Sequence, residues 1–225
     1  MTGAERGRFI TFEGGEGVGK STQLRRLAEH LRACGIEAVT TREPGGTPKA
    51  ERLRRILLSG RIAPLGALAE ATLFAAARID HVENLIAPSL ARGAWVLCDR
   101  FTDSTRAYQG ARGGVEPQAL ALLEKAAVGD LEPDLTIVID LPPKDGLARA
   151  AVRREVAGER ADRFEAEDGG FHEGLRRAFL DIAEREPERC CVVNGALPPD
   201  EVARAIRQLV DARFLDAQPA ATAAQ

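Results

Sequence analysis

Gly14-Gly15-Glu16-Gly17-Val18-Gly19-Lys20-Ser21-Thr22 fits the pattern GxxxxGK[ST] and directly follows an apolar run at Arg8–Phe12. Glycines let a backbone curl so that successive N–H groups point inward at phosphate oxygens, and a helix beginning near Lys20 adds the positive end of its dipole. Lys20 is predicted to reach the β and γ phosphates, and the Ser21 hydroxyl is predicted to ligate Mg²⁺. The whole stretch is therefore predicted to bind the phosphates of ATP.

The glycine-rich stretch has two other interpretations. A glycine-rich turn that binds nothing is the simplest alternative, although chance produces such a match in a chain of this composition only roughly a few times per thousand. A dinucleotide-binding loop is excluded, because the spacing GxGxxG is absent. The stretch therefore favours a phosphate-binding loop.

The rest of the chain alternates between strand-like and helix-like sequence. Strand character is found at Arg8–Phe12, Glu37–Thr41, Trp95–Asp99, Leu135–Asp140 and Cys190–Val193. The helical pattern is clearest over Ser21–Cys34, Leu65–Leu90, Pro117–Val128, Asp145–Val156, Phe171–Glu184 and Pro199–Phe214. This alternation implies a parallel sheet covered on both faces. The predicted fold class is α/β, a P-loop NTPase three-layer α/β/α sandwich with a five-stranded parallel sheet.

Length and local composition predict how the chain is organised. The chain has 225 residues, 44% of them hydrophobic, which suits a single domain, predicted over residues 1–215. The stretch 157–170 is charged, contains three glycines and has Phe164 as its one large apolar side chain, so an exposed mobile loop is predicted there. The tail 216–225 lacks bulky apolar side chains and is predicted to be flexible.

The charge balance argues against a large polyanionic partner. A net charge of −3 is small beside 31 basic and 34 acidic side chains, so no overall field recruits nucleic acid or an anionic membrane. No apolar run approaches the ~20 residues that span a bilayer, and residues 1–8 lack the apolar stretch of a signal peptide. The four cysteines show no CxxC spacing, which speaks against a zinc site or a disulfide framework. We expect a cytoplasmic protein.

The phosphate-binding loop alone does not separate a kinase from a GTPase or a mechanical ATPase. The base-reading tetrapeptide NKxD of GTPases does not occur in the chain. A mechanical ATPase usually has an acidic pair after a hydrophobic strand, whereas Trp95–Cys98 is followed by Asp99 and Arg100. An arginine beside the metal-side carboxylate indicates a second anion in the site. This favours phosphoryl transfer between two bound phosphorylated molecules.

Four blocks of the sequence are similar to the thymidylate kinase family, and the resemblance runs from about Phe9 to the last helix. The first block is the phosphate-binding loop with Phe12 and Glu13 before it. The others are Thr41-Arg42-Glu43-Pro44-Gly45-Gly46-Thr47, Phe74-Ala75-Ala76-Ala77-Arg78, and Asp99-Arg100 followed by Ser104-Thr105-Arg106-Ala107-Tyr108-Gln109-Gly110. The order and spacing of these blocks are specific to this family of nucleoside-monophosphate kinases, and the resemblance is to its bacterial-type members.

The resemblance implies a binding site for the base of dTMP. Phe74 would lie against the thymine ring, and Arg78, four residues later on the same helical face, would hydrogen-bond the edge of the base. Thr105 and Gln109 would line the same pocket. A phenylalanine in the core of the protein is the alternative for Phe74.

The resemblance also implies contacts to the sugar and phosphate of dTMP. Arg42 and Arg100 would hold the acceptor phosphate, with surface salt bridges as the alternative. Glu16 would lie near the 3′-hydroxyl, unless it is exposed to solvent. Tyr108 would pack against C2′ and disfavour a ribose hydroxyl. Asp99 would approach Mg²⁺, through water.

Catalysis in this family requires cations around the transferred phosphoryl group. Lys20 and Arg100 are expected to act there. Since Gly17 follows the acidic residue of the loop, a lid over about residues 153–169 should supply the further cation, from Arg154 or Arg163. A solvated run of charge is the alternative for this segment. By the same resemblance, Arg149 would lie beside the adenine of ATP.

The implied reaction is ATP + dTMP giving ADP + dTDP, a step of dTTP biosynthesis, with Mg²⁺ as cofactor. The family implies a homodimer, to which the Leu65–Leu90 helix could contribute an apolar face. The three histidines, His30, His81 and His172, are interpreted as structural or surface residues. Two rival functions stay open, a P-loop kinase for another small acceptor and a nucleotide-dependent binding switch.

Overall fold

A parallel sheet of five strands forms the centre of the molecule, in the order β2-β3-β1-β4-β5. The structure is a computed structural model that describes residues 6–158, 161 and 163–216. Its strands are β1 (Phe9–Glu13), β2 (Ala38–Arg42), β3 (Trp95–Asp99), β4 (Leu135–Asp140) and β5 (Cys190–Asn194). The predicted five-stranded parallel sheet is confirmed, with strand ends shifted by at most one residue.

Strand β1 lies in the middle of the sheet, and all of its residues are buried. Ile10 and Phe12 pack into the core on one face, whereas Phe9 packs into a second core on the other face. Side chains alternate along a strand, so Thr11 and Glu13 lie on the same side as Phe9. Both are fully buried despite their polarity.

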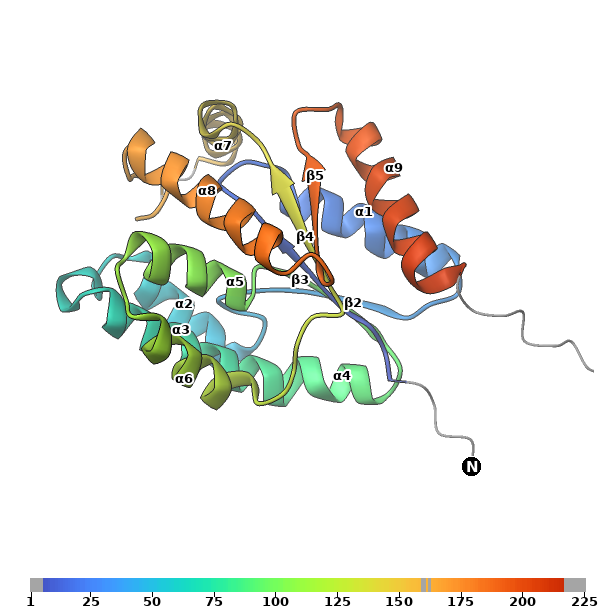
Figure 1. Cartoon of the computed structure of the whole chain (residues 1–225), viewed down its shortest axis with the longest axis horizontal. Coiled ribbons are helices and arrows are strands. Elements are labelled where there is room, and N and C mark those ends of the chain that lie inside the picture. The colour runs from blue at the N-terminus through green and yellow to red at the C-terminus, as the bar shows by residue number, and fades with distance from the viewer. Residues whose placement is uncertain (1–5, 159–160, 162, 217–225) are drawn as a thin grey trace, which may run out of the picture.

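Helices cover both faces of the sheet and complete the predicted three-layer sandwich (Figure 1). One face carries α1 (Lys20–Ala33) and α9 (Pro199–Val210), which contact each other. The other face carries α4 (Ala87–Ala91) and α8 (Gly169–Arg185). On that side α3 (Ala67–His81) packs between α2 (Pro48–Leu58) and α6 (Pro117–Val128).

The helix predicted over Leu65–Leu90 is interrupted. It consists of α3, a π-helical turn at Val82–Ile86, and α4. Pro88 has no backbone N–H, and in a regular α-helix its ring would clash with the carbonyl of Asn84. The wider π turn contains Asn84 and removes this clash.

Two α-helices among the described residues were not predicted from the sequence. In α2 the Thr47 side chain caps the first turn by accepting a hydrogen bond from Ala50 N at 3.2 Å, and Pro48 occupies the first position. Thr followed by Pro is a start signal for a helix, so α2 was predictable. The other segment is α5 (Thr102–Thr105), which continues as a π-helical stretch over Arg106–Arg112.

The loop predicted at 157–170 is shorter and less exposed than expected. Helix α7 (Pro143–Ala157) precedes it, and α8 already begins at Gly169. Phe164 is only 8% exposed and packs edge-on against the ring of Tyr108, with centroids 5.2 Å apart. The prediction of an exposed loop is therefore wrong for Phe164, because an aromatic side chain gains more from this contact than from water.

The last described residues pack against the core, where the ring of Phe214 lies edge-on to that of Trp95 with centroids 5.6 Å apart. A π-helical turn at Asp211–Leu215 follows α9. Apart from Asp216, the tail predicted to be flexible lies outside the described residues. No helix in the described part of the chain has both the length and the apolar character needed to span a bilayer.

A matched pair of substitutions compares an interior strand with an edge strand. Val96 on β3 is fully buried, whereas Val192 on the edge strand β5 is 50% exposed. Val96→Ala should lower the free energy of unfolding by about 2 kcal/mol, because it removes buried methyl groups and leaves a cavity. Val192→Ala should cost less than about 1 kcal/mol. Equal losses in urea denaturation would contradict the observed strand order.

Candidate active site

A cavity of about 680 Å³ opens at the carboxyl ends of β1, β2 and β3. It brings together most of the residues that the sequence singled out. Its wall includes Glu16, Gly17, Val18, Gly19, Lys20, Ser21, Thr22, Arg42, Phe74, Arg78, Asp99, Arg100, Thr105, Tyr108, Gln109 and Arg149. Gly14, Gly15, Arg154 and Arg163 do not line it.

The phosphate-binding loop lies between β1 and α1, as predicted. Gly14, Gly17 and Gly19 have positive φ angles of 128°, 66° and 102°, which only glycine adopts readily. Gly17 also packs against α7, since a Cβ there would lie 1.9 Å from the carbonyl oxygen of Gly146. The loop is therefore built for glycine both by its backbone angles and by its packing.

Lys20, at the first position of α1, points back over this loop. Its Nζ donates hydrogen bonds to the carbonyl oxygens of Gly14 at 3.1 Å and Gly15 at 2.7 Å. Burial and the positive charge of Arg100 lower the pKa of Lys20 to about 8, although Glu16 and other carboxylates oppose this. A phosphate anion beside Nζ would favour the charged form.

Ser21 and Asp99 offer oxygen ligands for a metal ion. The hydroxyl of Ser21, in the first turn of α1, donates a hydrogen bond to Oδ2 of Asp99 at the end of β3. Within the described residues, no three His, Cys, Asp or Glu side chains gather into a metal cluster. A site with two protein oxygens suits Mg²⁺, which keeps several waters and binds substrate phosphates.

Arg100 occupies a special backbone position directly after β3. Its φ of 72° is the one positive value among the described non-glycine residues. Its guanidinium donates to Oε1 of Glu16 at 2.7 Å and to the carbonyl of Gly14 at 3.2 Å. It also lies 5.1 Å from the ring centroid of Tyr108. The unusual backbone angle thus turns a cation toward the phosphate-binding loop.

Glu16 accepts hydrogen bonds from both Arg100 and Tyr108. Besides Arg100, the hydroxyl of Tyr108 donates to its Oε1 at 2.6 Å. Burial alone would raise the pKa of Glu16, but Arg100, Lys20 and the Tyr108 hydrogen bond lower it to about 2. Glu16 is therefore ionised at neutral pH, and it is not the solvent-exposed residue of the alternative interpretation.

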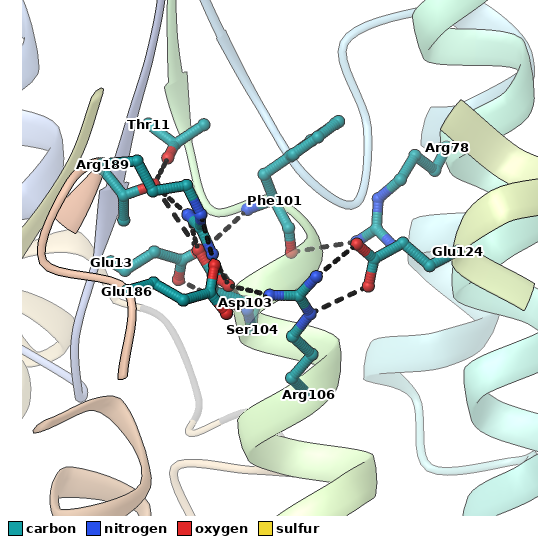
Figure 2. Close-up of polar contacts among 11 residues, drawn as sticks. Thr11, Glu13, Arg78, Phe101, Asp103, Ser104, Arg106, Glu124, Glu186 and Arg189 are labelled. Atoms are coloured by element: carbon teal, nitrogen blue, oxygen red, sulfur yellow. Dashed lines mark hydrogen bonds and ion pairs between the residues drawn. The ribbon is translucent and has the colours of Figure 1, made fainter. Parts of the chain in front are cut away.

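Glu13 is a buried residue of this site that the sequence did not single out. Its Oε1 accepts hydrogen bonds from Phe101 N at 2.7 Å and Ser104 N at 3.3 Å, and its Oε2 accepts one from Ser104 Oγ at 2.6 Å (Figure 2). Burial and the nearby Asp103 raise the pKa of Glu13 to about 7. Glu13 therefore holds the turn that carries Arg100.

Three elements supply the pocket predicted for the base. Phe74 and Arg78 come from α3, Thr105 ends α5, and Tyr108 and Gln109 lie in the π-helical stretch. Arg78 is only 3% exposed, and its Nη2 donates to the carbonyl of Phe101 at 3.0 Å and to Thr105 Oγ1 at 3.1 Å. Arg78 thus reaches the cavity from within the protein core.

The arginines predicted for the lid are paired with acidic side chains. Arg154 donates to Oε2 of Glu165 at 2.7 Å, and Arg163 forms an ion pair with Glu70 at 2.7 Å. Neither reaches the cavity wall, whereas Arg153, which also bonds to Glu165, lines it. Residues 159, 160 and 162 of this segment lie outside the described residues.

Arg42 and Arg149 lie on opposite sides of the cavity. Arg42, at the end of β2, pairs with Glu51 of α2 at 3.1 Å, and its side chain stays 56% exposed. Arg149 of α7 donates to the carbonyl of Gly195 at 3.1 Å. Both residues line the cavity.

The fold and the site define a class of protein. The phosphate-binding loop follows the central strand of a parallel sheet with the order 2-3-1-4-5, and arginines face the loop across one cavity. This is the arrangement of a P-loop phosphotransferase.

Comparison with known proteins gives the family. The profile described as thymidylate kinase matches residues 12–206. The thymidylate kinase of Bradyrhizobium sp. strain BTAi1 is 53% identical, over 98% of this chain and 96% of the relative. That of Rhodopseudomonas palustris strain TIE-1 is 57% identical, over 94% and 91%. The crystal structure of thymidylate kinase from Ehrlichia chaffeensis superposes with a TM-score of 0.72 at 34% identity, over 91% of this chain and 99% of that one. The chain belongs to the thymidylate kinase family.

The pKa of Glu13 predicts how stability depends on pH. Its pKa of about 7 in the folded protein lies above the ordinary glutamate value of 4.5, so the stabilisation it provides is present below pH 4.5 and is lost as pH rises through 7. The difference in unfolding free energy between the wild type and Glu13→Gln should therefore fall by up to about 3 kcal/mol between pH 5 and 8. Urea denaturation across this range measures it. A constant difference would show that Glu13 titrates normally.

Proposed function

We propose that residues 1–215 act as one kinase domain that transfers the γ-phosphoryl group of ATP directly to dTMP, giving ADP and dTDP. One observation carries this proposal. A single cavity is lined both by the phosphate-binding loop and by the pocket of Phe74 and Arg78, with Arg100 between them. Donor and acceptor can therefore meet with their phosphates in line.

On the donor side, the loop backbone and Lys20 bind the β and γ phosphates, and Arg149 lies beside the adenine. Ser21 and Asp99 hold Mg²⁺, which when bound neutralises charge on the donor phosphates. The hydrogen bond between these two side chains supports this role, because it keeps both oxygens at the start of α1.

On the acceptor side, Arg100 and Arg42 bind the phosphate of dTMP. These cations reduce the repulsion between the two polyanions as they approach. Glu16, ionised with a pKa of about 2, is able to accept a hydrogen bond from the 3′-hydroxyl of the sugar. The ring of Tyr108 packs against C2′, which leaves little room for a ribose hydroxyl.

The base of dTMP occupies the pocket between α3 and α5. Phe74 offers an aromatic face to thymine, and Arg78, Thr105 and Gln109 face the polar edges of the base. The accepting phosphate group of dTMP is already an anion, so the reaction requires no general base. Catalysis by this site rests on positioning and on charge stabilisation.

We further propose that the enzyme is a homodimer. Leu68 on α3 is 53% exposed and Leu122 on the neighbouring α6 is 73% exposed. Large apolar side chains on two adjacent helices are suited to an isologous contact, which buries the same patch on both subunits.

A panel of acceptors tests the proposed reaction. With ATP and Mg²⁺, ADP production should be fastest with dTMP and lower with dUMP, since one methyl group in a pocket discriminates by roughly 10–200-fold. UMP and CMP should react far more slowly, and thymidine, which lacks the acceptor phosphate, negligibly. Preference for another nucleotide would overturn the assignment of the base pocket but leave the phosphate-binding loop intact.

Alanine substitutions of three lid arginines test which one supplies the transition-state cation. Arg154→Ala or Arg163→Ala should lower kcat by about 10³-fold, because an arginine beside the transferred group is worth that much. The kcat of Arg153→Ala is compared with that of these two variants, since Arg153 already lines the cavity. If both Arg154→Ala and Arg163→Ala keep kcat within about tenfold of the wild type, the sequence-based choice of these two is wrong.

A further inference from the structure

A buried chain of hydrogen bonds lies behind the base pocket. Glu43, in the loop after β2, is 5% exposed and uses each carboxylate oxygen for a different residue of α3. Its Oε2 accepts from Nε of Arg78 at 2.6 Å, and its Oε1 lies 3.0 Å from Nδ1 of His81. The other ring nitrogen of His81 lies 2.7 Å from Oγ1 of Thr41. None of the proposed steps of phosphoryl transfer uses Glu43 or His81.

The packing around this chain leaves its members little freedom. His81 is fully buried, and the backbone of Glu43 is anchored to the end of β3 by a hydrogen bond from its N–H to the carbonyl of Asp99 at 2.9 Å. A Cβ on Gly46 would lie 2.4 Å from Nε2 of His81 and 2.5 Å from Oγ1 of Thr41. The loop therefore closes directly over the imidazole.

This packing determines which donors of Arg78 are free. Its guanidinium is a planar group with five N–H donors. Glu43 occupies Nε, and the carbonyl of Phe101 and Oγ1 of Thr105 occupy Nη2. Among the described residues, no hydrogen bond involves Nη1. Since Arg78 lines the cavity, Nη1 is the group left to meet a ligand.

We propose that Glu43, supported by His81, is a positioning residue that fixes the guanidinium of Arg78 and thereby sets the preference for a 4-oxo over a 4-amino pyrimidine. This inference rests on the proposed function, in which Arg78 faces the base. The guanidinium of Arg78 has donors only, so it can donate a hydrogen bond to the 4-carbonyl oxygen of thymine or uracil. The 4-amino group of cytosine is itself a donor and cannot accept this hydrogen bond. A rigid guanidinium enforces this difference, because it cannot turn away from the wrong base.

The test compares kcat/KM for dTMP, dUMP and dCMP in the wild type and in Glu43→Gln. Glutamine keeps the shape and one acceptor but loses the charge that holds Nε, so Arg78 is held less firmly. The ratio of dTMP to dCMP should fall about tenfold, the change expected for loss of one charge-assisted hydrogen bond. The ratio of dTMP to dUMP should stay within about twofold, because both bases carry the 4-oxo group.

A matched control separates this effect from general loss of stability. Glu124→Gln removes the same kind of charge from an ion pair with Arg106, at 2.6 Å, outside the cavity wall (Figure 2). It should leave both ratios unchanged. A second variant, His81→Asn, keeps a polar partner near Oε1 of Glu43, and it should lower the dTMP to dCMP ratio less than Glu43→Gln does.

The outcomes distinguish the inference from the function on which it rests. If the wild type does not phosphorylate dTMP, the proposed function fails and the inference falls with it. If the wild type does so and Glu43→Gln lowers all three acceptors equally, or if Glu124→Gln changes the ratios as much, only the positioning role is overturned. Should Glu43→Gln fail to fold, an unchanged dTMP to dCMP ratio in His81→Asn overturns it.

Discussion

The hydrogen bonds to Glu13 join the ends of the neighbouring strands β1 and β3, and the geometry of the cavity depends on this connection. Glu13 ends β1, and it accepts from the backbone of Phe101 just after β3. The N–H of Arg100 bonds to the carbonyl of Phe12 at 2.9 Å, so the turn is tied to β1 twice. These ties hold Arg100 in its left-handed conformation, whose cost is of order 1–3 kcal/mol. Without them, the cation beside the phosphate-binding loop would have no fixed direction.

The sequence predicted the sheet and the phosphate-binding loop because both depend on local patterns, namely apolar runs and glycine spacing. The cavity-lining residues of β2, α3 and α5 were located through the resemblance to a family, since these three elements meet only in the folded chain. Glu13 and Glu43 escaped prediction because an acidic residue in a sequence is normally taken as exposed. Their burial depends on partners such as Phe101 N and Arg78, which lie far away along the chain. The burial of Phe164 was not predicted either, because its neighbours in the sequence are charged and indicated an exposed loop.

Glu16 links two cations of the cavity electrostatically. It neutralises Arg100, and its charge also stabilises that of Lys20. Two buried cations without a carboxylate would repel each other and favour deprotonation of Lys20. The same carboxylate therefore keeps both cations charged within the cavity.

The ion pairs of Arg154 and Arg163 differ in the partners that remain for the carboxylate when the pair is broken. Glu70 is only 3% exposed, and if Arg163 moved away, Gln109 Nε2 at 3.5 Å would be its remaining hydrogen-bond donor among the described residues. A buried carboxylate without a good partner is strongly destabilising. Glu165, in contrast, is bonded by both Arg153 and Arg154, so it keeps one arginine when the other leaves. On this ground Arg154 can leave its ion pair at a lower cost than Arg163.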